Sequence, residues 1–165
     1  MPTLFWDASG LVKRYTAEQG SDVADALFAA VPASAMITTV WGYAETFSIL
    51  LRKRNDGRLN TPAFNTAAIA LRREVIDSRD MGFLVIDESA VLAGLSLMEQ
   101  HNVNTTDASL LAAFLRCARS QHPAASSCIL AAADKRLLRA AEAEGLQVLD
   151  LQALSAADVP TFLAG

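Results

Sequence analysis

Four acidic residues stand far apart in the sequence but at comparable places: Asp7, Glu45, Asp107 and Asp134. Two of them follow apolar runs typical of strands, and the other two lie in the first or second turn of an expected helix. Parallel sheets bind ligands beyond the carboxyl ends of their strands, so all four could face one edge of a sheet. Two carboxylates at ~4 Å repel by about 4 kcal/mol at an effective dielectric near 20. Such a cluster is expected to hold a hard divalent cation, Mg²⁺ or Mn²⁺, or to bind protons.

Each acid also has a structural interpretation. An aspartate at a helix start often only caps the helix. Glu45 differs, because its helical neighbours include Trp41 and Ile49, and a carboxylate buried between them needs a metal or a basic partner. The alternative is a Glu45 side chain that extends to the helix edge. Asp87 and Asp150 also end expected strands, and spacing alone does not separate them from the four.

Basic side chains gather at the end of the helix expected to carry Glu45. They are Arg52, Lys53, Arg54 and Arg58. The net charge of −4 does not by itself indicate a nucleic-acid-binding protein, but a local basic cluster can contact phosphates. The alternative is an ordinary solvated helix end.

The elements that must position these side chains alternate along the chain. Apolar runs typical of strands occur at residues 4–6, 36–38, 83–86, 128–130 and 147–149. Capping signals between them predict helices that begin near Ser21, Thr39, Thr61, Ser89, Thr106 and Asp134. The third of these helices is expected to run to about residue 78. This alternation predicts an α/β fold, a mostly parallel sheet with helices on both faces, in one domain spanning residues 1–165.

Composition excludes several classes of protein. Hydrophobic residues make up 52% of the 165, which predicts a large core and argues against disorder. Cys117 and Cys128 lie in apolar surroundings and are expected to pack in that core. The longest uncharged run, residues 26–44, is interrupted by proline, glycine and hydroxyl side chains, so we expect no membrane span. The first apolar run is too short for a signal-peptide core, so we expect a cytoplasmic protein.

Four short motifs together resemble the PIN-domain nucleases, and the whole chain most resembles the VapC-type toxins of toxin–antitoxin pairs. The motifs are Asp7-Ala8-Ser9, Tyr43-Ala44-Glu45, residues 106–112 and residues 133–138. Their order and spacing match across nearly the full length. The resemblance implies a five-stranded sheet in the order 3-2-1-4-5. Asp7 and Asp134 would then end neighbouring strands, while Asp87 and Asp150 would end the two edge strands.

The same resemblance implies a Mg²⁺-dependent (or Mn²⁺-dependent) endoribonuclease. Asp7 and Asp107 are then primary metal ligands, Glu45 a ligand or a base that orients water, and Asp134 a ligand of a second or weaker metal. Ser9 would be accessory, bonding a carboxylate or a metal-bound water. The implied partners are an RNA substrate, contacted by the basic cluster, and a small cognate antitoxin. We also expect a homodimer or a higher homo-oligomer.

Two departures from the family pattern keep other functions open. Ala132 stands where the family often has a hydroxyl residue two positions before its fourth acid, and Ala8 replaces a frequent Ser or Thr. A PIN-like protein that binds RNA or a partner without cutting is therefore the main alternative. A phosphatase with Asp7 as nucleophile fits less well, because that chemistry usually needs a second aspartate where Ser9 stands.

Overall fold

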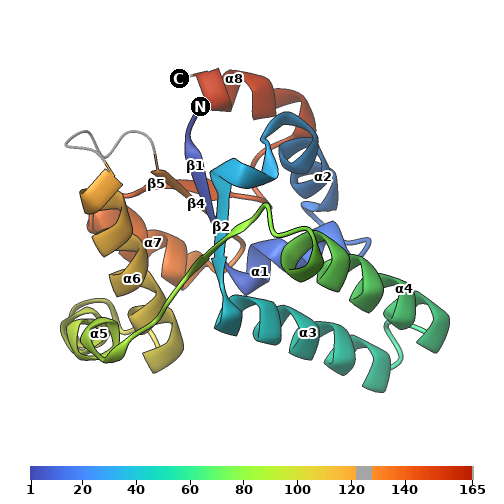
Figure 1. Ribbon diagram of the computed structural model, residues 1–165, viewed down its shortest axis with the longest axis horizontal. Coiled ribbons are helices and arrows are strands. Elements are labelled where there is room, and N and C mark those ends of the chain that lie inside the picture. The colour runs from blue at the N-terminus through green and yellow to red at the C-terminus, as the bar shows by residue number, and fades with distance from the viewer. Residues whose placement is uncertain (122–127, 165) are drawn as a thin grey trace.

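The computed structural model describes residues 1–121 and 128–164 and contains one five-stranded sheet (Figure 1). Its strands are β1 (Thr3–Trp6), β2 (Met36–Thr39), β3 (Gly82–Leu84), β4 (Cys128–Ala132) and β5 (Gln147–Asp150). Every strand pair is parallel and the order is β3-β2-β1-β4-β5. The expected α/β class and the expected strand order are both confirmed. The order reverses between β1 and β4, and that is where parallel sheets form ligand sites.

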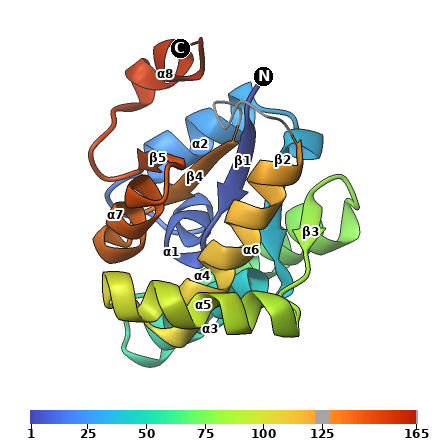
Figure 2. The same cartoon turned by 90° about the vertical axis from the view of Figure 1, so that its left-hand side faces the viewer.

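Helices and helical turns connect the strands. Before β3 they are α1 (Ala8–Leu11), η1 (Val12–Arg14), α2 (Ser21–Ala30), η2 (Ala33–Ala35), α3 (Val40–Asn55), α4 (Thr61–Leu71) and the π-helical turn η3 (Arg72–Asp77). After it come α5 (Glu88–His101), α6 (Thr105–Gln121), α7 (Lys135–Ala143), η5 (Ala156–Asp158) and α8 (Val159–Ala164). Figure 1 shows α2, α3 and α4 on one side of the sheet and α5, α6 and α7 on the other. Figure 2 looks onto the second side, where α5 and α6 cross in front of the strands.

The strand β1 shows why both faces are covered. Side chains alternate along a strand, so Leu4 and Trp6 join the core beneath α2 and α4, whereas Phe5 joins the core beneath α6 and α7. All three are fully buried. Phe5 stacks on Phe114 of α6 with ring centroids 4.5 Å apart. A continuous apolar run is what a strand buried on both faces requires, which explains why such short runs predicted the sheet.

Some element boundaries differ from the sequence-based expectation. Gly20, with φ of 88°, occupies the N-cap position of α2, so Ser21 is already helical. Asn60 rather than Thr61 caps α4, and its side chain accepts a hydrogen bond of 2.8 Å from the Ala63 backbone N–H. The helix expected to run to residue 78 changes to a π-helical turn after Leu71, and the third strand is displaced to begin at Gly82.

In residues 1–121 and 128–164, no helix is both long and apolar enough to cross a membrane. Cys128 is buried in β4 and Cys117 half-buried in α6. Cys128 belongs to the core beneath α6 and α7, and Cys117 packs against it, as the sequence predicted.

Candidate active site

Asp7 links the end of β1 to the start of α1. Its carboxylate caps α1, because Oδ2 accepts hydrogen bonds from the Ser9 backbone N–H at 2.9 Å and from the Ser9 hydroxyl. Gly10 lets α1 lie directly against β4, since a Cβ at this position would stand 2.7 Å from the Ala131 carbonyl oxygen. The side chain of Asp7 is only 5% exposed, so a buried carboxylate stands at the switch point of the sheet.

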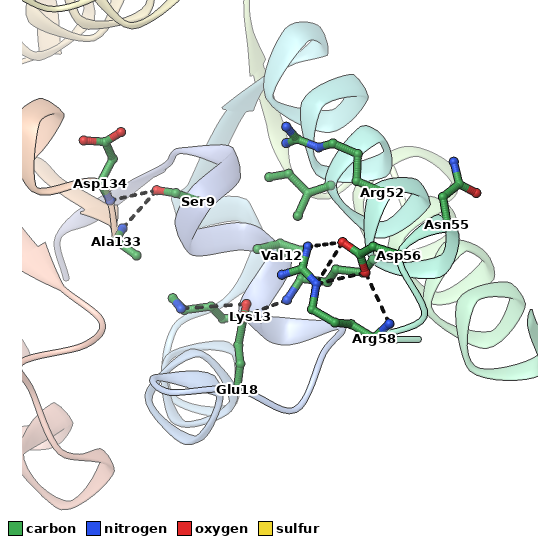
Figure 3. Close-up of a pocket in the computed structure, with 12 residues that line it drawn as sticks. Ser9, Val12, Lys13, Glu18, Arg52, Asn55, Asp56, Arg58, Ala133 and Asp134 are labelled. Carbon is green, nitrogen blue, oxygen red and sulfur yellow. Dashed lines mark hydrogen bonds and ion pairs between the residues drawn. The ribbon is translucent and has the colours of Figure 1, made fainter. Parts of the chain in front are cut away.

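Ser9 joins the ends of the two neighbouring strands. Its hydroxyl donates to Asp7 and accepts from the backbone N–H groups of Ala133 at 3.0 Å and Asp134 at 3.1 Å (Figure 3). Asp134 in turn caps α7, because its Oδ1 accepts from the Arg136 N–H at 2.8 Å and the Leu137 N–H at 3.2 Å. The start of α7 therefore orients the Asp134 carboxylate.

Glu45 lies in the second turn of α3, whose start is fixed by Thr39. The Thr39 hydroxyl accepts a 2.8 Å hydrogen bond from the Gly42 N–H, as the sequence predicted. The expected burial of Glu45 between Trp41 and Ile49 is wrong: Glu45 is exposed, and Trp41 is 46% exposed. The alternative, a Glu45 side chain at the solvent edge of the helix, describes the structure better. Any functional role of Glu45 therefore depends on the groups near its carboxylate and does not follow from burial of the side chain.

Asp107 is held by a residue that the sequence analysis did not single out. The helix α6 begins at Thr105, one residue before the expected start, and the Asn104 side chain accepts from the Asp107 N–H at 2.9 Å. The Asn104 amide also donates to Asp107 Oδ2 at 2.8 Å. An Asn three residues before an acid is a recognisable capping signal, and it would have identified Asn104.

All four acids line one cavity of about 490 Å³, which we call the acid cavity. Its walls also include Ser9, Ser48, Arg52 and Asn104. Neither Asp87 nor Asp150 belongs to it. Asp87 caps α5 and pairs with Arg116 at 3.0 Å, and Asp150 pairs with Lys135. The structure thus separates the acids that the sequence could not.

The four carboxylates influence one another electrostatically. Burial, followed by the charges of Asp7, Asp134 and Glu45, raises the pKa of Asp107 to about 7. Burial chiefly raises the pKa of Asp7, against the hydrogen bonds from Ser9. Partial desolvation and then Asp7 raise the pKa of Glu45, and Arg52 opposes them. Burial contributes most to these raised pKa values and the neighbouring negative charges add to it, so a bound cation would favour the ionised carboxylates.

The donor set of the acid cavity fits a hard cation. Within the described residues, Asp107 Oδ1, Asp134 Oδ2 and both oxygens of Glu45 accept no hydrogen bond, whereas the Asp7 carboxylate accepts hydrogen bonds from Ser9 and from the Ala8 backbone. Carboxylate oxygens are the ligands that Mg²⁺ and Mn²⁺ prefer. In the same part of the chain, however, no three acidic, His or Cys side chains converge closely enough to grip one ion. The acids surround a common space and are each fastened to their own helix start or helix face.

The four residues of the expected basic cluster have different surroundings in the structure. The Lys53 Nζ donates to Glu18 Oε2 at 2.7 Å, Arg54 stacks over Phe64 at 4.7 Å, and Arg58 pairs with Asp56 at 2.6 Å. Arg52 alone of the four lines the acid cavity, and its side chain makes no hydrogen bond or ion pair with any described residue. Phosphate contact must therefore be considered for each of the four residues separately.

Comparison with known proteins supports the fold. No family model and no curated protein matches the sequence. Among solved structures, the crystal structure of PAE2754 from Pyrobaculum aerophilum is similar, with a TM-score of 0.58 and 15% sequence identity over 99% of this chain and 96% of that chain. At this identity the likeness shows a shared fold along the chain and nothing about activity.

Proposed function

We propose that this protein is a PIN-like, Mg²⁺- or Mn²⁺-dependent endoribonuclease. The observation that carries the proposal is the acid cavity, where four carboxylates from four separate elements line one space and three of them keep an oxygen with no hydrogen-bond donor. A purely structural cap uses its carboxylate locally and has no reason to share a cavity with three others. The sequence motifs that resemble PIN-domain nucleases supply the same four residues.

In this proposal each acid has a role. Asp7 and Asp107 hold the cation, Asp134 contributes a further or weaker ligand, and Glu45 binds or orients the attacking water. A bound divalent cation would lower the pKa of that water and stabilise charge on the scissile phosphate. Arg52 lines the same cavity, where it interacts electrostatically with Glu45, and in this proposal it contacts the phosphate. Ser9 keeps the ends of β1 and β4 together, so it positions Asp7 relative to Asp134.

The acids also set the order of binding. A cavity with four carboxylates and one arginine repels a phosphodiester, so the cation must bind before or together with the RNA. Because the pKa of Asp107 is about 7, this carboxyl carries a proton in much of the cation-free protein at neutral pH. Binding of a cation releases that proton, which makes metal affinity rise with pH.

The resemblance to VapC-type toxins extends the proposal to a cytoplasmic toxin. Its partner would be a small antitoxin that covers the acid cavity with a basic side chain, and the toxin would form a homodimer or a higher homo-oligomer. Expression of the chain alone should slow growth, and co-expression of the small protein encoded beside it should restore growth. A well-expressed, harmless wild-type chain would remove the toxin role and leave the nuclease chemistry open.

The test of nuclease activity is cleavage of total RNA by the purified protein with and without Mg²⁺, beside Asp7→Asn. We expect Mg²⁺-dependent cleavage that Asp7→Asn, Glu45→Gln and Asp107→Asn lose by more than roughly 100-fold, because direct ligands matter more than the outer-shell partners whose loss costs 10–100-fold. Asp87→Asn is the matched control, since it removes the charge of an aspartate that caps a helix outside the cavity. Equal activity of Asp7→Asn and wild type would exclude the proposal.

The alternative is a PIN-like protein that binds RNA or a partner without cutting. Ala132 favours it, as does the absence of three converging ligands among the described residues. It predicts RNA binding without cleavage in either Mg²⁺ or Mn²⁺, so the same assay distinguishes it.

A further inference from the structure

Figure 3 shows residues that line a second cavity, of about 740 Å³. This cavity adjoins the acid cavity. The two share Ser9, Ile49, Arg52 and Asp134 as lining residues. Beyond that shared wall, its charged residues are two lysines, an arginine and two carboxylates: Lys13, Lys53, Arg58, Glu18 and Asp56. We call this cavity the lysine pocket. Its charge balance is opposite to that of the acid cavity.

Two buried ammonium groups share one carboxylate in this pocket. Lys13 is 4% exposed and Lys53 is 9% exposed. Their Nζ atoms lie 3.8 Å from Glu18 Oε1 and 2.7 Å from Glu18 Oε2, respectively. Burial by itself raises the pKa of Glu18, but the Lys53 hydrogen bond and the Lys13 charge outweigh it and hold this pKa low. One negative charge therefore serves two positive charges that have little access to water.

The hydrogen-bond donors of the two lysines are not exhausted. An ammonium group carries three N–H donors. Within the described residues, Lys13 donates to the Gln19 carbonyl at 2.8 Å and Lys53 donates to Glu18, and neither makes another hydrogen bond. A buried charge without a full set of partners is costly, so this arrangement favours an anion in the adjoining space.

The remaining charges of the pocket do not supply that anion. Both oxygens of Asp56 accept hydrogen bonds from the Arg58 guanidinium, at 3.0 Å and 2.6 Å, so this pair is neutral. Arg52 adds a positive charge on the wall shared with the acid cavity, where its electrostatic partner is Glu45, which does not line the lysine pocket. Counting Asp134, the lining still carries four cations against three carboxylates.

We propose that the lysine pocket binds a backbone phosphate of the RNA strand, next to the phosphate held over the acids. The identification of the ligand as RNA rests on the proposed nuclease function, whereas the preference for an anion rests on the buried lysines. A strand whose scissile phosphate lies in the acid cavity and passes Ser9 enters the lysine pocket directly, because the cavities share that wall. The substrate is then a strand that extends beyond the cut on the side of α3.

The opposite charges give the pocket a property that the acid cavity lacks. Phosphate binding over the acids requires a cation, but phosphate binding by Lys13 and Lys53 does not. RNA should therefore retain measurable affinity in EDTA, and that residual affinity should depend on the lysine pocket. Because the binding is electrostatic, it should weaken as salt rises, by roughly 0.7 logarithmic units per phosphate contact for each tenfold change in salt on a single strand.

The experiment measures binding of a fluorescent single-stranded RNA oligonucleotide in EDTA over a series of salt concentrations. Lys13→Met and Lys53→Met should each bind roughly tenfold more weakly and lower the salt slope by roughly 0.7. Glu18→Gln removes the carboxylate between the lysines and should bind more tightly than wild type. Arg139→Gln, an exposed arginine of α7 outside both cavities, is the control for overall charge and should bind like wild type.

Circular dichroism of each variant checks the fold. If a lysine variant does not fold, Glu18→Gln decides, because its effect has the opposite sign to a loss of structure. An unchanged slope in folded lysine variants, or unchanged affinity in Glu18→Gln, overturns the proposal. Cleavage of the same oligonucleotide in Mg²⁺ is scored separately. If RNA binding follows the predicted pattern but no cleavage occurs, the lysine pocket is supported and the nuclease proposal is excluded. If cleavage occurs but the salt slope of binding is unchanged in the lysine variants, only the lysine-pocket proposal is excluded.

Discussion

The acid cavity and the lysine pocket share a wall, yet their ionisable groups behave in opposite ways. In the acid cavity, neighbouring carboxylates add to the effect of burial, so the pKa of Asp107 rises to about 7. In the lysine pocket, two lysines outweigh burial and the pKa of Glu18 falls. Both contain carboxylates in partly desolvated places, so burial alone does not determine the outcome. The number of cations within reach does, and on this ground we propose a metal for the acid cavity and an anion for the lysine pocket.

The largest expected effect separates Asp134 from Asp7 within the acid cavity. Asp134 is oriented by the start of α7 through one oxygen, without a hydroxyl at position 132. We therefore expect Asp134→Asn to raise the Mg²⁺ concentration for half-maximal cleavage by roughly tenfold, with partial recovery at high Mg²⁺ or Mn²⁺. Asp7→Asn should show no such recovery, because it loses a direct ligand.

A metal titration of cleavage by both variants measures this difference. If both variants lose cleavage activity equally and no Mg²⁺ or Mn²⁺ concentration restores it, Asp134 is a direct metal ligand like Asp7. Full activity of Asp134→Asn at low Mg²⁺ would reduce Asp134 to a helix cap.

A smaller effect is expected at the wall between the cavities. Ser9→Ala removes the acceptor of two backbone N–H groups and a donor to Asp7. Leaving such groups unpaired costs about 1–3 kcal/mol, so thermal unfolding should occur at a lower temperature. Ser9→Thr keeps the hydroxyl and serves as the control. A melting temperature of Ser9→Ala equal to that of wild type would contradict the role of Ser9 as the link between β1 and β4.

A third effect is expected in the pH dependence of stability without metal. The pKa of Asp107 is about 7 in the folded protein, while a carboxyl of this type in an unfolded chain has a pKa of about 3.9. Between these two pH values the folded state binds more protons than the unfolded state. The contribution of the protonated Asp107 carboxyl to the free energy of unfolding is therefore fully present below about pH 4 and is lost as pH rises through 7.

Denaturant unfolding in EDTA at pH 5, 6, 7 and 8 measures this loss. Asp107→Asn should flatten the dependence, and Mg²⁺ at pH 8 should restore stability to the wild type. A wild-type protein as stable in EDTA at pH 8 as at pH 5 would show that the acids do not crowd one another.

Much of the fold could be predicted from the sequence, because each central strand is buried on both faces and so appears as an apolar run. The α/β class follows from alternation, while the strand order came from resemblance to the PIN-domain nucleases. Errors fell at element ends. The left-handed conformation of Gly20 and the capping by Asn60 shift helix starts by one residue. Neither depends on periodicity, so periodicity did not locate them.

The site was less predictable where it depends on distant partners. The acids could be found because each stands near a strand end or a helix start. The division of the basic cluster could not, since Lys53 pairs with Glu18, 35 positions earlier in the chain. Lys13 stands next to Arg14 in the sequence, where nothing indicates that it is buried, and its burial comes from tertiary contacts. The predicted burial of Glu45 is wrong because its helical neighbour Trp41 is itself 46% exposed, so an apolar neighbour did not mean a covered helix face.

The most direct test of the account is whether the four acids bind one divalent cation together. Calorimetric titration of the purified protein with Mn²⁺ at pH 7.5 measures this without any assumption about RNA. We predict that wild type and Asp87→Asn bind Mn²⁺ with the same affinity and release protons on binding, whereas Asp7→Asn and Asp107→Asn lose most of that affinity. Failure of the wild type to bind Mn²⁺, or unchanged binding by Asp7→Asn, would contradict a metal centre in the acid cavity.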